Sequence, residues 1–364
     1  MVERKKELLQ EILKAAGKCD RCGNCLLVCP VTTVNSKETC NPRGMINAAL
    51  ALVQGGVAPE PQILAAVDYC LLCGACIDVC PSKIKVPTVL LKVRQYLADL
   101  SDKNAFFSLE QQERINSAFD ELCERCAAIE EAENSVRKAA YFFSCQARLN
   151  GMEAAAATVR LLSKTADVEL VNNECCGLPL LARGLVGEYK ELLQENIKLY
   201  EDYDIIVADC ACCADTLKKS AEYLAESKEW QDSAKAFSEK VILLSSYLQL
   251  AGYQATNSNV SATYHDPCLA NRNLKIKKQP RELLQQAADY IEMQCADSCC
   301  GGPCFFPADY PETACALLAK KAENIEKSGA AVVATECYNC LRQLKQAAEQ
   351  SNGKFKAVHI SELL

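Results

Sequence analysis

The stretch Asp297-Ser298-Cys299-Cys300-Gly301-Gly302 sets two adjacent cysteines before two glycines, and Cys175-Cys176-Gly177 repeats its core earlier in the chain. A disulfide between neighbouring residues is strained outside ordinary disulfide geometry. Two adjacent thiolates in an irregular loop can instead reach neighbouring irons of one cluster, and a following glycine permits a positive φ and close approach of the backbone. Both stretches therefore predict metal-thiolate chemistry.

Around these two loops the sequence repeats itself from residue 139 onward. Strands are expected at 140–144, 168–171 and 204–208 in the first half, and at 262–265 and 330–334 in the second. Helices are expected at 153–164, at 312–328 and in a segment that runs through Tyr290. Cysteines follow the strands in the same order in both halves, which predicts an internal duplication. Alternating strands and helices predict a small parallel sheet in each half, with the cysteines at the carboxyl ends of its strands, where ligands bind.

Two copies of C-x2-C-x2-C-x3-C-P lie nearer the N-terminus, at 19–30 and 70–81. In bacterial ferredoxins three cysteines of this motif hold one [4Fe-4S] cube and the fourth crosses to the other. By that rule Cys19, Cys22, Cys25 and Cys80 hold the first cluster, and Cys70, Cys73, Cys76 and Cys29 hold the second. A pair of zinc sites is the alternative, although zinc sites usually separate two Cys-x2-Cys halves by a dozen or more residues.

Length and composition limit the other possibilities. The 364 residues are too many for one ordinary core, which predicts two or three domains. The net charge of -7 offers no basic face, so we expect no nucleic-acid partner. The longest apolar runs fall far short of the roughly 18 residues of a membrane span, so we expect no direct span. There is no G-x-G-x-x-G after a strand and no phosphate-binding loop motif, which places any flavin or NAD on another chain.

The 25 cysteines also bear on the compartment. The charged start at residues 1–7 is followed by apolar residues at helical spacing, which describes an amphipathic helix rather than a signal peptide. We therefore expect a reducing cytoplasmic location, with any attachment to the inner face of the membrane made through a partner.

In these motifs the chain resembles the CCG-domain iron-sulfur proteins. They include the D, B and C subunits of heterodisulfide reductase and the iron-sulfur subunits of glycolate oxidase and anaerobic glycerol-3-phosphate dehydrogenase. The resemblance implies a noncubane [4Fe-4S] cluster in one or both halves, with zinc or an empty structural site as the alternative in one of them. The first set would be Cys145, Cys175, Cys176, Cys210 and Cys213, and the second, which would also be the catalytic one, Cys268, Cys299, Cys300, Cys337 and Cys340.

The expected fold class is α/β with an α-helical ferredoxin domain that carries two cubane [4Fe-4S] clusters, followed by two duplicated, Rossmann-like, parallel α/β CCG domains. We expect the ferredoxin domain at 1–98, a helical connector at 99–138, and the CCG domains at 139–256 and 257–364.

Four clusters on one chain predict an electron-transfer subunit of a multi-subunit oxidoreductase of heterodisulfide reductase type. The resemblance implies a flavoprotein or a cytochrome b as partner. One alternative is a catalytic subunit that reduces a disulfide or heterodisulfide at a noncubane cluster. A second is the iron-sulfur subunit of a flavin-dependent 2-hydroxy acid or glycerol-3-phosphate dehydrogenase. Both five-cysteine sets are complete, which favours the heterodisulfide-reductase-like subunits.

Residues near these sets have candidate roles of their own. His265 could donate a proton to a leaving thiolate, or be a loop histidine capped by Asp266. Cys212 and Cys304 are alternative ligands, whereas Cys40, Cys295 and Cys315 are expected to be small core residues, and Cys123 and Cys126 incidental. Arg148 and Arg272 could each hold an anion or tune a cluster, with a solvated arginine as the default.

Overall fold

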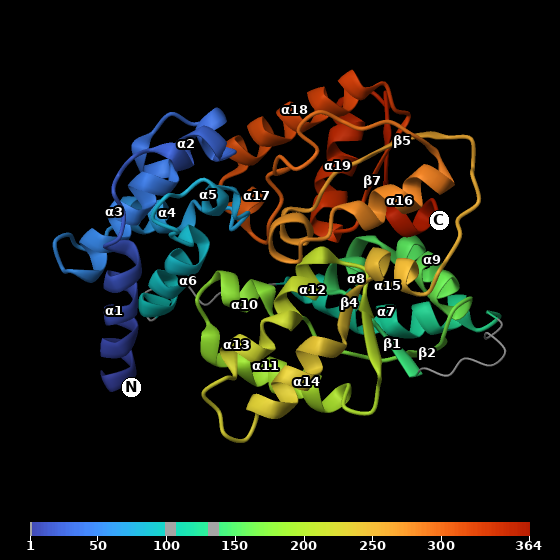
Figure 1. The fold of residues 1–364 in the computed structure, drawn as a ribbon, viewed down its shortest axis with the longest axis horizontal. Coiled ribbons are helices and arrows are strands. Elements are labelled where there is room, and N and C mark those ends of the chain that lie inside the picture. The colour runs from blue at the N-terminus through green and yellow to red at the C-terminus, as the bar shows by residue number, and fades with distance from the viewer. Residues whose placement is uncertain (1, 99–106, 130–137) are drawn as a thin grey trace. The chain divides into compact units, whose positions relative to one another are not determined.

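A computed structural model of the chain describes residues 2–98, 107–129 and 138–364 (Figure 1). The chain divides into two compact units, each built from segments that are distant in sequence. The first comprises residues 1–104, 179–186 and 299–319, and the second comprises residues 105–178, 187–298 and 320–364. The boundaries after residues 98, 138 and 256 stay predictions, and the expected connector at 99–138 lies partly outside the described residues.

The regular elements described in the first unit are helices. They are α1 (Val2–Ala16), α2 (Asn24–Val28), α3 (Pro42–Val53), α4 (Pro61–Asp68), α5 (Ala75–Asp78), α6 (Val86–Tyr96), most of α10 (Leu178–Ala182), α17 (Phe306–Asp309) and the first half of α18 (Pro311–Ser328). Apolar residues at helical spacing bury one face of each long helix, as Ile12 of α1, Ile46 of α3 and Leu90 of α6 do in one common core. The predicted helical ferredoxin module is confirmed in its fold.

Arg94 of α6 organises the loops of this unit. Its guanidinium is buried and donates to the carbonyl oxygens of Asp68 and Cys70 at 3.0 and 3.3 Å, and to that of Ala182 at 2.8 Å. A planar guanidinium with five donors suits such a site better than a lysine would. Arg94 thereby fixes the loop that begins at Cys70 and joins the 179–186 segment to the helical core.

The second unit contains two four-stranded parallel sheets of identical order, β2-β1-β3-β4 and β6-β5-β7-β8. The strands are β1 (Lys138–Phe142), β2 (Asp167–Leu170), β3 (Ile205–Ala208), β4 (Val241–Leu243), β5 (Ser261–Tyr264), β6 (Asp289–Tyr290), β7 (Val332–Thr335) and β8 (Lys356–His359). The identical order confirms the predicted duplication and the mixed α/β class with parallel sheets.

Helices connect and cover these strands. They are α7 (Leu109–Cys126), α8 (Cys145–Asn150), α9 (Met152–Ser163), α11 (Val186–Leu199), α12 (Ala211–Lys218), α13 (Ser220–Tyr223), α14 (Gln231–Lys240), α15 (Leu244–Leu250), α16 (Lys278–Ala287), the second half of α18, and α19 (Tyr338–Gln350), with a π-helical turn at Leu269–Asn273. Helix α9 packs on β2, α16 on β5 and β6, and α19 on β7 and β8. The central strands β1, β3 and β7 are consequently buried almost throughout.

The expected strands lie within two residues of those observed, but one helix is misplaced. The helix expected to run through Tyr290 ends at Ala287, and Asp289–Tyr290 form the short edge strand β6. The edge strands β4 and β8 were not expected, since three or four residues between helices give too short a pattern to tell a strand from a helix turn.

Candidate iron-sulfur sites

The two ferredoxin motifs fold into matching loops. Gly23 and Gly74, which follow the second cysteine of each motif, have φ of 85° and 76° and precede the short helices α2 and α5. Arg21 and Leu72, at equivalent positions two residues earlier, both have a φ of 55°. L-residues rarely adopt positive φ, so its recurrence at two equivalent positions indicates one loop geometry with one purpose.

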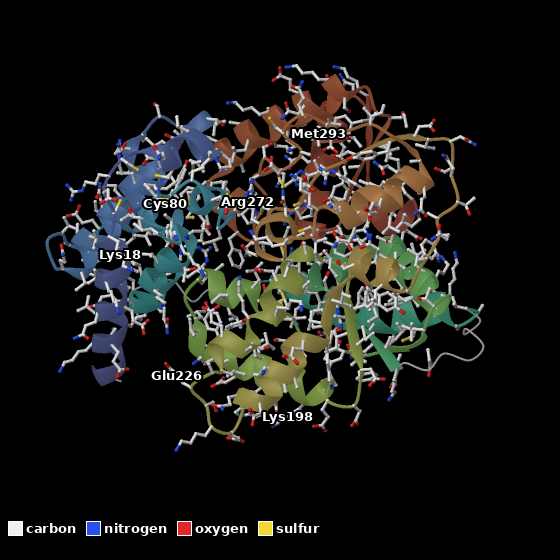
Figure 2. The ribbon with its side chains drawn as sticks, viewed as in Figure 1. Lys18, Cys80, Lys198, Glu226, Arg272 and Met293 are labelled. Atoms are coloured by element: carbon white, nitrogen blue, oxygen red, sulfur yellow. The ribbon has the colours of Figure 1, made fainter. Side chains whose placement is uncertain are left out.

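The thiols of these loops lie close enough to influence one another. Burial raises the pKa of Cys76, and the neighbouring Cys70, Cys73 and Cys29 raise it further. Those four are the predicted second set. Burial also raises the pKa of Cys25, with contributions from Cys19, Cys22 and Cys29. Backbone N–H groups of Leu72 and Ile84 donate to Cys70 Sγ and Cys80 Sγ, each at 3.4 Å (Cys80 is labelled in Figure 2).

The first CCG set converges at the carboxyl ends of three strands. Cys145 begins α8 after β1, Cys175 and Cys176 follow β2, and Cys210 and Cys213 lie between β3 and α12. The Sγ atoms of Cys145 and Cys175 are 3.7 Å apart. A hydrogen bond with Cys175 raises the pKa of Cys176, and hydrogen bonds with Cys176 and Cys210 raise that of Cys213. All five predicted ligands are therefore in one connected group of thiols.

Gly177 allows the Cys175-Cys176 loop to close. Its φ is 84°, and a Cβ atom there would come within 2.5 Å of the buried Tyr189 ring. We predict that Gly177→Ala lowers the free energy of unfolding by about 2–4 kcal/mol, because it combines backbone strain with overpacking. Thermal or urea unfolding measures this loss. Gly187→Ala is the matched control, since nothing lies within 4 Å of a Cβ at Gly187. Equal stability of the two variants would contradict the prediction.

The second CCG set has members in both units. In the second unit, Cys268 follows β5, Cys337 follows β7 and Cys340 lies on α19, with hydrogen bonds between the thiols of Cys337 and Cys340. Cys299 and Cys300 belong to the first unit, where both are buried. Gly301 follows them with a φ of 79°, as Gly177 follows its pair.

Within the first unit the Cys299 loop lies beside the second ferredoxin motif. Tyr69, which directly precedes Cys70, packs its ring against Phe306 and Tyr310 with centroids 5.6 and 4.3 Å away. Its hydroxyl also forms a hydrogen bond with Thr313. The charge of Cys299 raises the pKa of both Cys29 and Cys70, after the larger effect of burial. The CCG loop and two predicted ligands of a ferredoxin cluster are thus electrostatic neighbours.

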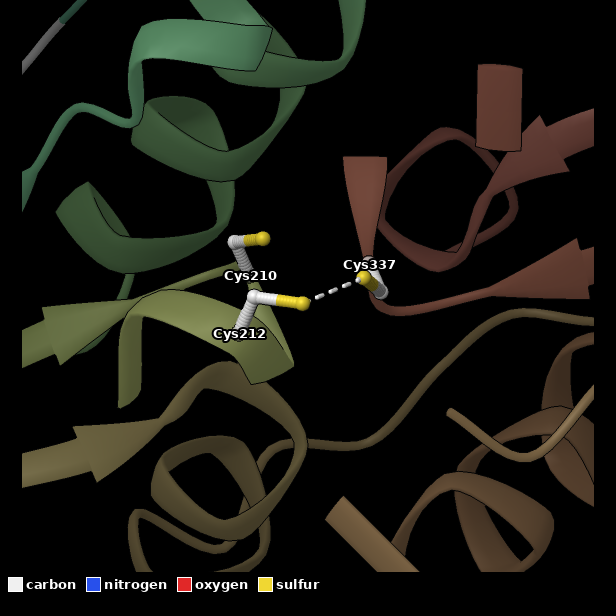
Figure 3. A group of neighbouring side chains, drawn as sticks. All are labelled: Cys210, Cys212 and Cys337. Carbon is white, nitrogen blue, oxygen red and sulfur yellow. Dashed lines mark hydrogen bonds between the residues drawn. The ribbon is translucent and has the colours of Figure 1, made fainter. Parts of the chain in front are cut away.

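Cys212 links the two repeats of the second unit. Its Sγ lies 3.4 Å from Cys337 Sγ, and Cys210 completes a buried group whose sulfur atoms are all within 4.8 Å of one another (Figure 3). Asn339 Nδ2, which occupies the position of Cys212 in the second repeat, donates to Cys212 Sγ at 3.6 Å. The sequence marks Cys212 as an alternative ligand through its place inside Cys210-Ala211-Cys212-Cys213, but gives no sign of this contact between repeats.

An acidic residue precedes the first cysteine of each C-x-x-C pair. Asp209 is buried, and one of its carboxylate oxygens accepts from the hydroxyls of Tyr141 and Tyr338 at 2.7 Å each. Glu336 is buried too, and its Oε1 accepts from Ser245 N at 2.6 Å. The sequence analysis did not single out either residue, because an acidic residue directly before a cysteine is not part of any metal-ligand motif.

Burial raises the pKa of Glu336 to about 8, and the Ser245 N–H only partly offsets this. Between about pH 4.5 and 8 the unfolded chain loses a proton that the folded chain keeps, so the free energy of unfolding falls as the pH rises. Glu336→Gln, which keeps the acceptor, should remove a penalty on the order of 4 kcal/mol at pH 8 and little at pH 5. Thermal unfolding at both pH values tests this, with the exposed Glu349→Gln as control. If the free energy of unfolding of Glu336→Gln depended on pH as steeply as that of the wild type, the prediction would be wrong.

His265 lies after β5 and is 1% exposed. Neither ring nitrogen has a hydrogen-bond partner. Asp266 does not cap it, as one expectation had it, because both carboxylate oxygens of Asp266 accept from Arg281 at 2.8 Å. Burial lowers the pKa of His265 well below its usual value, and Lys321 and Arg272 lower it further.

Other predicted residues have mixed outcomes. Cys40 is buried as expected, but the prediction of core positions for Cys295 and Cys315 is wrong, since both are exposed. Cys304 lines a cavity of about 40 Å³ together with Cys70 and Arg94. Cys126 is buried on α7 and Cys123 half-buried.

The solvated default is wrong for both arginines. Arg148 is buried and donates to Phe143 O, Ile115 O, Asn172 Oδ1 and Asn173 O. Arg272, labelled in Figure 2, donates to Asp297 O at 2.9 Å and to Asp297 Oδ2 at 3.2 Å. Both therefore hold loops that carry or precede cysteines.

Among the described helices, none is long and apolar enough to cross a membrane.

Comparison with known proteins finds two kinds of domain along the chain. The cysteine-rich CCG domain model matches residues 139–218 and 262–345, and the 4Fe-4S dicluster domain model matches residues 15–84. The chain is 27% identical to the probable glycolate oxidase iron-sulfur subunit of Bacillus subtilis, over 95% of this chain and 92% of that protein. It is 25% identical to the B subunit of the fumarate reductase (CoM/CoB) of Methanothermobacter marburgensis, over 99% of this chain and 74% of that protein.

A solved structure shares the fold at a greater distance. The crystal structure of a hypothetical protein from Helicobacter pylori matches with a TM-score of 0.54 and 8% identity, over 100% of this chain and 72% of that one. Both ferredoxin motifs lie within the residues matched by the dicluster model, and each five-cysteine set lies within one of the two segments matched by the CCG model. The chain therefore belongs to the iron-sulfur proteins that combine a 4Fe-4S dicluster domain with two cysteine-rich CCG domains.

Proposed function

We propose that this chain is an electron-transferring iron-sulfur subunit of a multi-subunit oxidoreductase of heterodisulfide reductase type. The observation that carries the proposal is the packing of the Cys299 loop on the second ferredoxin motif in the first unit, where Tyr69, directly before Cys70, lies against Phe306 and Tyr310. A CCG loop beside predicted cubane ligands suits electron passage from one kind of cluster to the other.

The donor sets fit the clusters that the motifs imply. Each ferredoxin loop supplies three cysteines and a backbone with positive φ, and burial raises the pKa of the inner thiols. Buried thiols that gain no compensating cation are costly to ionise, and bound iron removes that cost. We assign Cys19, Cys22, Cys25 and Cys80 to one cubane, Cys70, Cys73, Cys76 and Cys29 to the other, and the two five-cysteine sets to noncubane clusters, in sheets that we regard as Rossmann-like. When bound, these clusters supply one-electron transfer.

The exposure of the ferredoxin cysteines suggests which of the two cubanes lies nearer to the redox partner. Cys22 is exposed, whereas Cys29, Cys73 and Cys76 are buried. Leu27, on helix α2 beside Cys25, is 84% exposed. A large apolar side chain in solvent next to a cluster loop is a natural contact for a redox partner. We call the cubane assigned to Cys19, Cys22, Cys25 and Cys80 the outer cubane, and the one assigned to Cys70, Cys73, Cys76 and Cys29 the inner cubane. Electrons would then pass between the partner and the outer cubane, from there to or from the inner cubane, and between the inner cubane and the CCG sites.

The relatives support a multi-subunit assembly, since both are named as subunits of oxidoreductases. We propose a flavoprotein or a cytochrome b as the partner and a cytoplasmic location, with any membrane contact made through that partner. Affinity purification of the intact chain under anaerobic conditions tests this. A flavin- or haem-containing protein in stoichiometric amount is expected, and purification of a fully active chain alone would refute it.

Metal analysis tests the cluster content itself. Four [4Fe-4S] clusters predict on the order of 16 irons and as many inorganic sulfides per chain. Paramagnetic resonance during a reductive titration should then resolve cubane signals and at least one signal of a different type. A chain reconstituted anaerobically that holds about eight irons, with zinc in the CCG sites, would contradict the proposal.

A further inference from the structure

His265 is an unexplained feature of the second repeat. A buried imidazole without any hydrogen bond is costly, because the nitrogen that carries no proton and the N–H both lose water without replacement. Both ring nitrogens of His265 lack a partner with hydrogen-bond geometry. A metal ion, which accepts an electron pair from a ring nitrogen, would account for a buried histidine in this position.

The ring lies beside a predicted cluster ligand. A ring nitrogen of His265 and the Sγ of Cys340 are within 4.8 Å of each other, and both residues are buried. The backbone around the ring is held on both sides: His265 N donates to Ala334 O at 2.9 Å, and Thr335 Oγ1 donates to His265 O at 3.2 Å. The imidazole is therefore placed by β5 and β7 rather than by a mobile loop.

The 295–296 segment packs beside the loop of His265, since Asp266 N donates to Ala296 O at 3.1 Å. Lys321 Nζ holds this segment by donating to Cys295 O and Ala296 O at 2.7 and 3.2 Å. A neutral imidazole has one lone pair to offer a metal, and a ligating histidine commonly directs its other N–H at a backbone carbonyl.

The first repeat has no such donor. Tyr264 of β5 pairs with Ala334 of β7 as Tyr141 of β1 pairs with Val207 of β3. Because Ala334 and Val207 both lie three residues before the first cysteine of a C-x-x-C pair, His265 corresponds to the buried Phe142. The two repeats thus differ in ligand chemistry at one equivalent position.

We propose that His265 is a nitrogen ligand to iron in the cluster of the second CCG repeat, where it binds beside Cys340. The inference rests on the proposed function, because it requires a cluster in that repeat. A histidine in place of a thiolate raises the reduction potential of an iron-sulfur cluster.

The test uses the two histidines of the chain, His265 and His359. The intact protein is produced with 15N-histidine, reconstituted anaerobically with iron and sulfide, and poised at successive potentials. Pulsed paramagnetic resonance should detect a histidine nitrogen coupling in one cluster signal of the wild type. The coupling should vanish in His265→Gln and persist in His359→Gln, since both nitrogens of His359 are already engaged by Ser361 and the Asp209 carbonyl.

His265→Cys separates ligation from a packing role. A thiolate in this place should retain the iron content and shift the potential of the same signal to more negative values, whereas a structural histidine would leave the potential unchanged. A wild-type second-repeat cluster without nitrogen coupling would overturn the inference and leave the proposed function standing. An iron content of the two cubanes alone would overturn both.

Discussion

Replacing Cys176 and Cys213 together with serine is expected to remove one noncubane cluster, about four irons per chain, while both cubane signals remain. The two thiols are buried and hydrogen-bonded to each other, and they join the Cys175 loop to the C-x-x-C pair after β3. Without them only three thiols of the set remain, those of Cys145, Cys175 and Cys210. Iron and sulfide analysis with paramagnetic resonance of the reduced protein measures the loss.

Cys315→Ser serves as the control for this change, because Cys315 is exposed on α18 and belongs to no predicted set. It should keep the full iron content. Circular dichroism separates cluster loss from unfolding, since β1, β3 and their helices should persist in the double variant. Simultaneous loss of the cubane signals from a folded protein would contradict independent sites in the two units.

The candidate ligand positions can be read from the sequence because they lie in local patterns. The ferredoxin spacing and the repeated Cys-Cys-Gly each span only a few residues. A glycine in such a motif also marks a position where the backbone can adopt a positive φ. The central strands are also predictable, since β1, β3 and β7 are short, mostly apolar runs, each followed two or three residues later by a cysteine. Parallel topology then brings those ends together.

What the sequence does not predict depends on contacts between distant segments. Cys212 meets Cys337 only because two repeats pack against each other in one unit, and no spacing encodes that distance. Arg148 looks like a surface residue of a helix start, yet four oxygen acceptors allow its burial. The edge strands β4 and β8 are equally context-dependent, since each forms by pairing with a strand already in place.

Division of the chain into units is the clearest case. The loop with Cys299 and Cys300 clusters with the N-terminal helices, where Tyr69 packs against Phe306 and Tyr310, and no local sequence pattern encodes that packing. Arg183 and Asp309, from the 179–186 and 299–319 segments, add an ion pair of 2.9 Å. Predicted ligands of a ferredoxin cluster and of a CCG cluster thus share one compact unit, as the proposed electron path requires.

Cys76 is the residue through which that arrangement can be tested. Burial raises its pKa, and all three of its predicted partners in the second set raise it further. Cys76→Ser should remove the inner cubane, about four irons, and leave the outer cubane and the CCG signals in place. Because the inner cubane would lie between the exposed Cys22 and the Cys299 loop, electrons given to the outer cubane should no longer reach the CCG clusters within the dead time of a rapid-freeze experiment.

Small redox mediators provide the control for this experiment, since they can reduce the CCG clusters directly and should restore their signals in Cys76→Ser. The exposed Cys295→Ser should behave as wild type in both arms. Rapid reduction of the CCG clusters in Cys76→Ser without a mediator would show that electrons bypass the second motif. The packing of the Cys299 loop on the second ferredoxin motif would then have only a structural role, and the CCG sites would have to receive electrons from a partner that docks on the second unit itself.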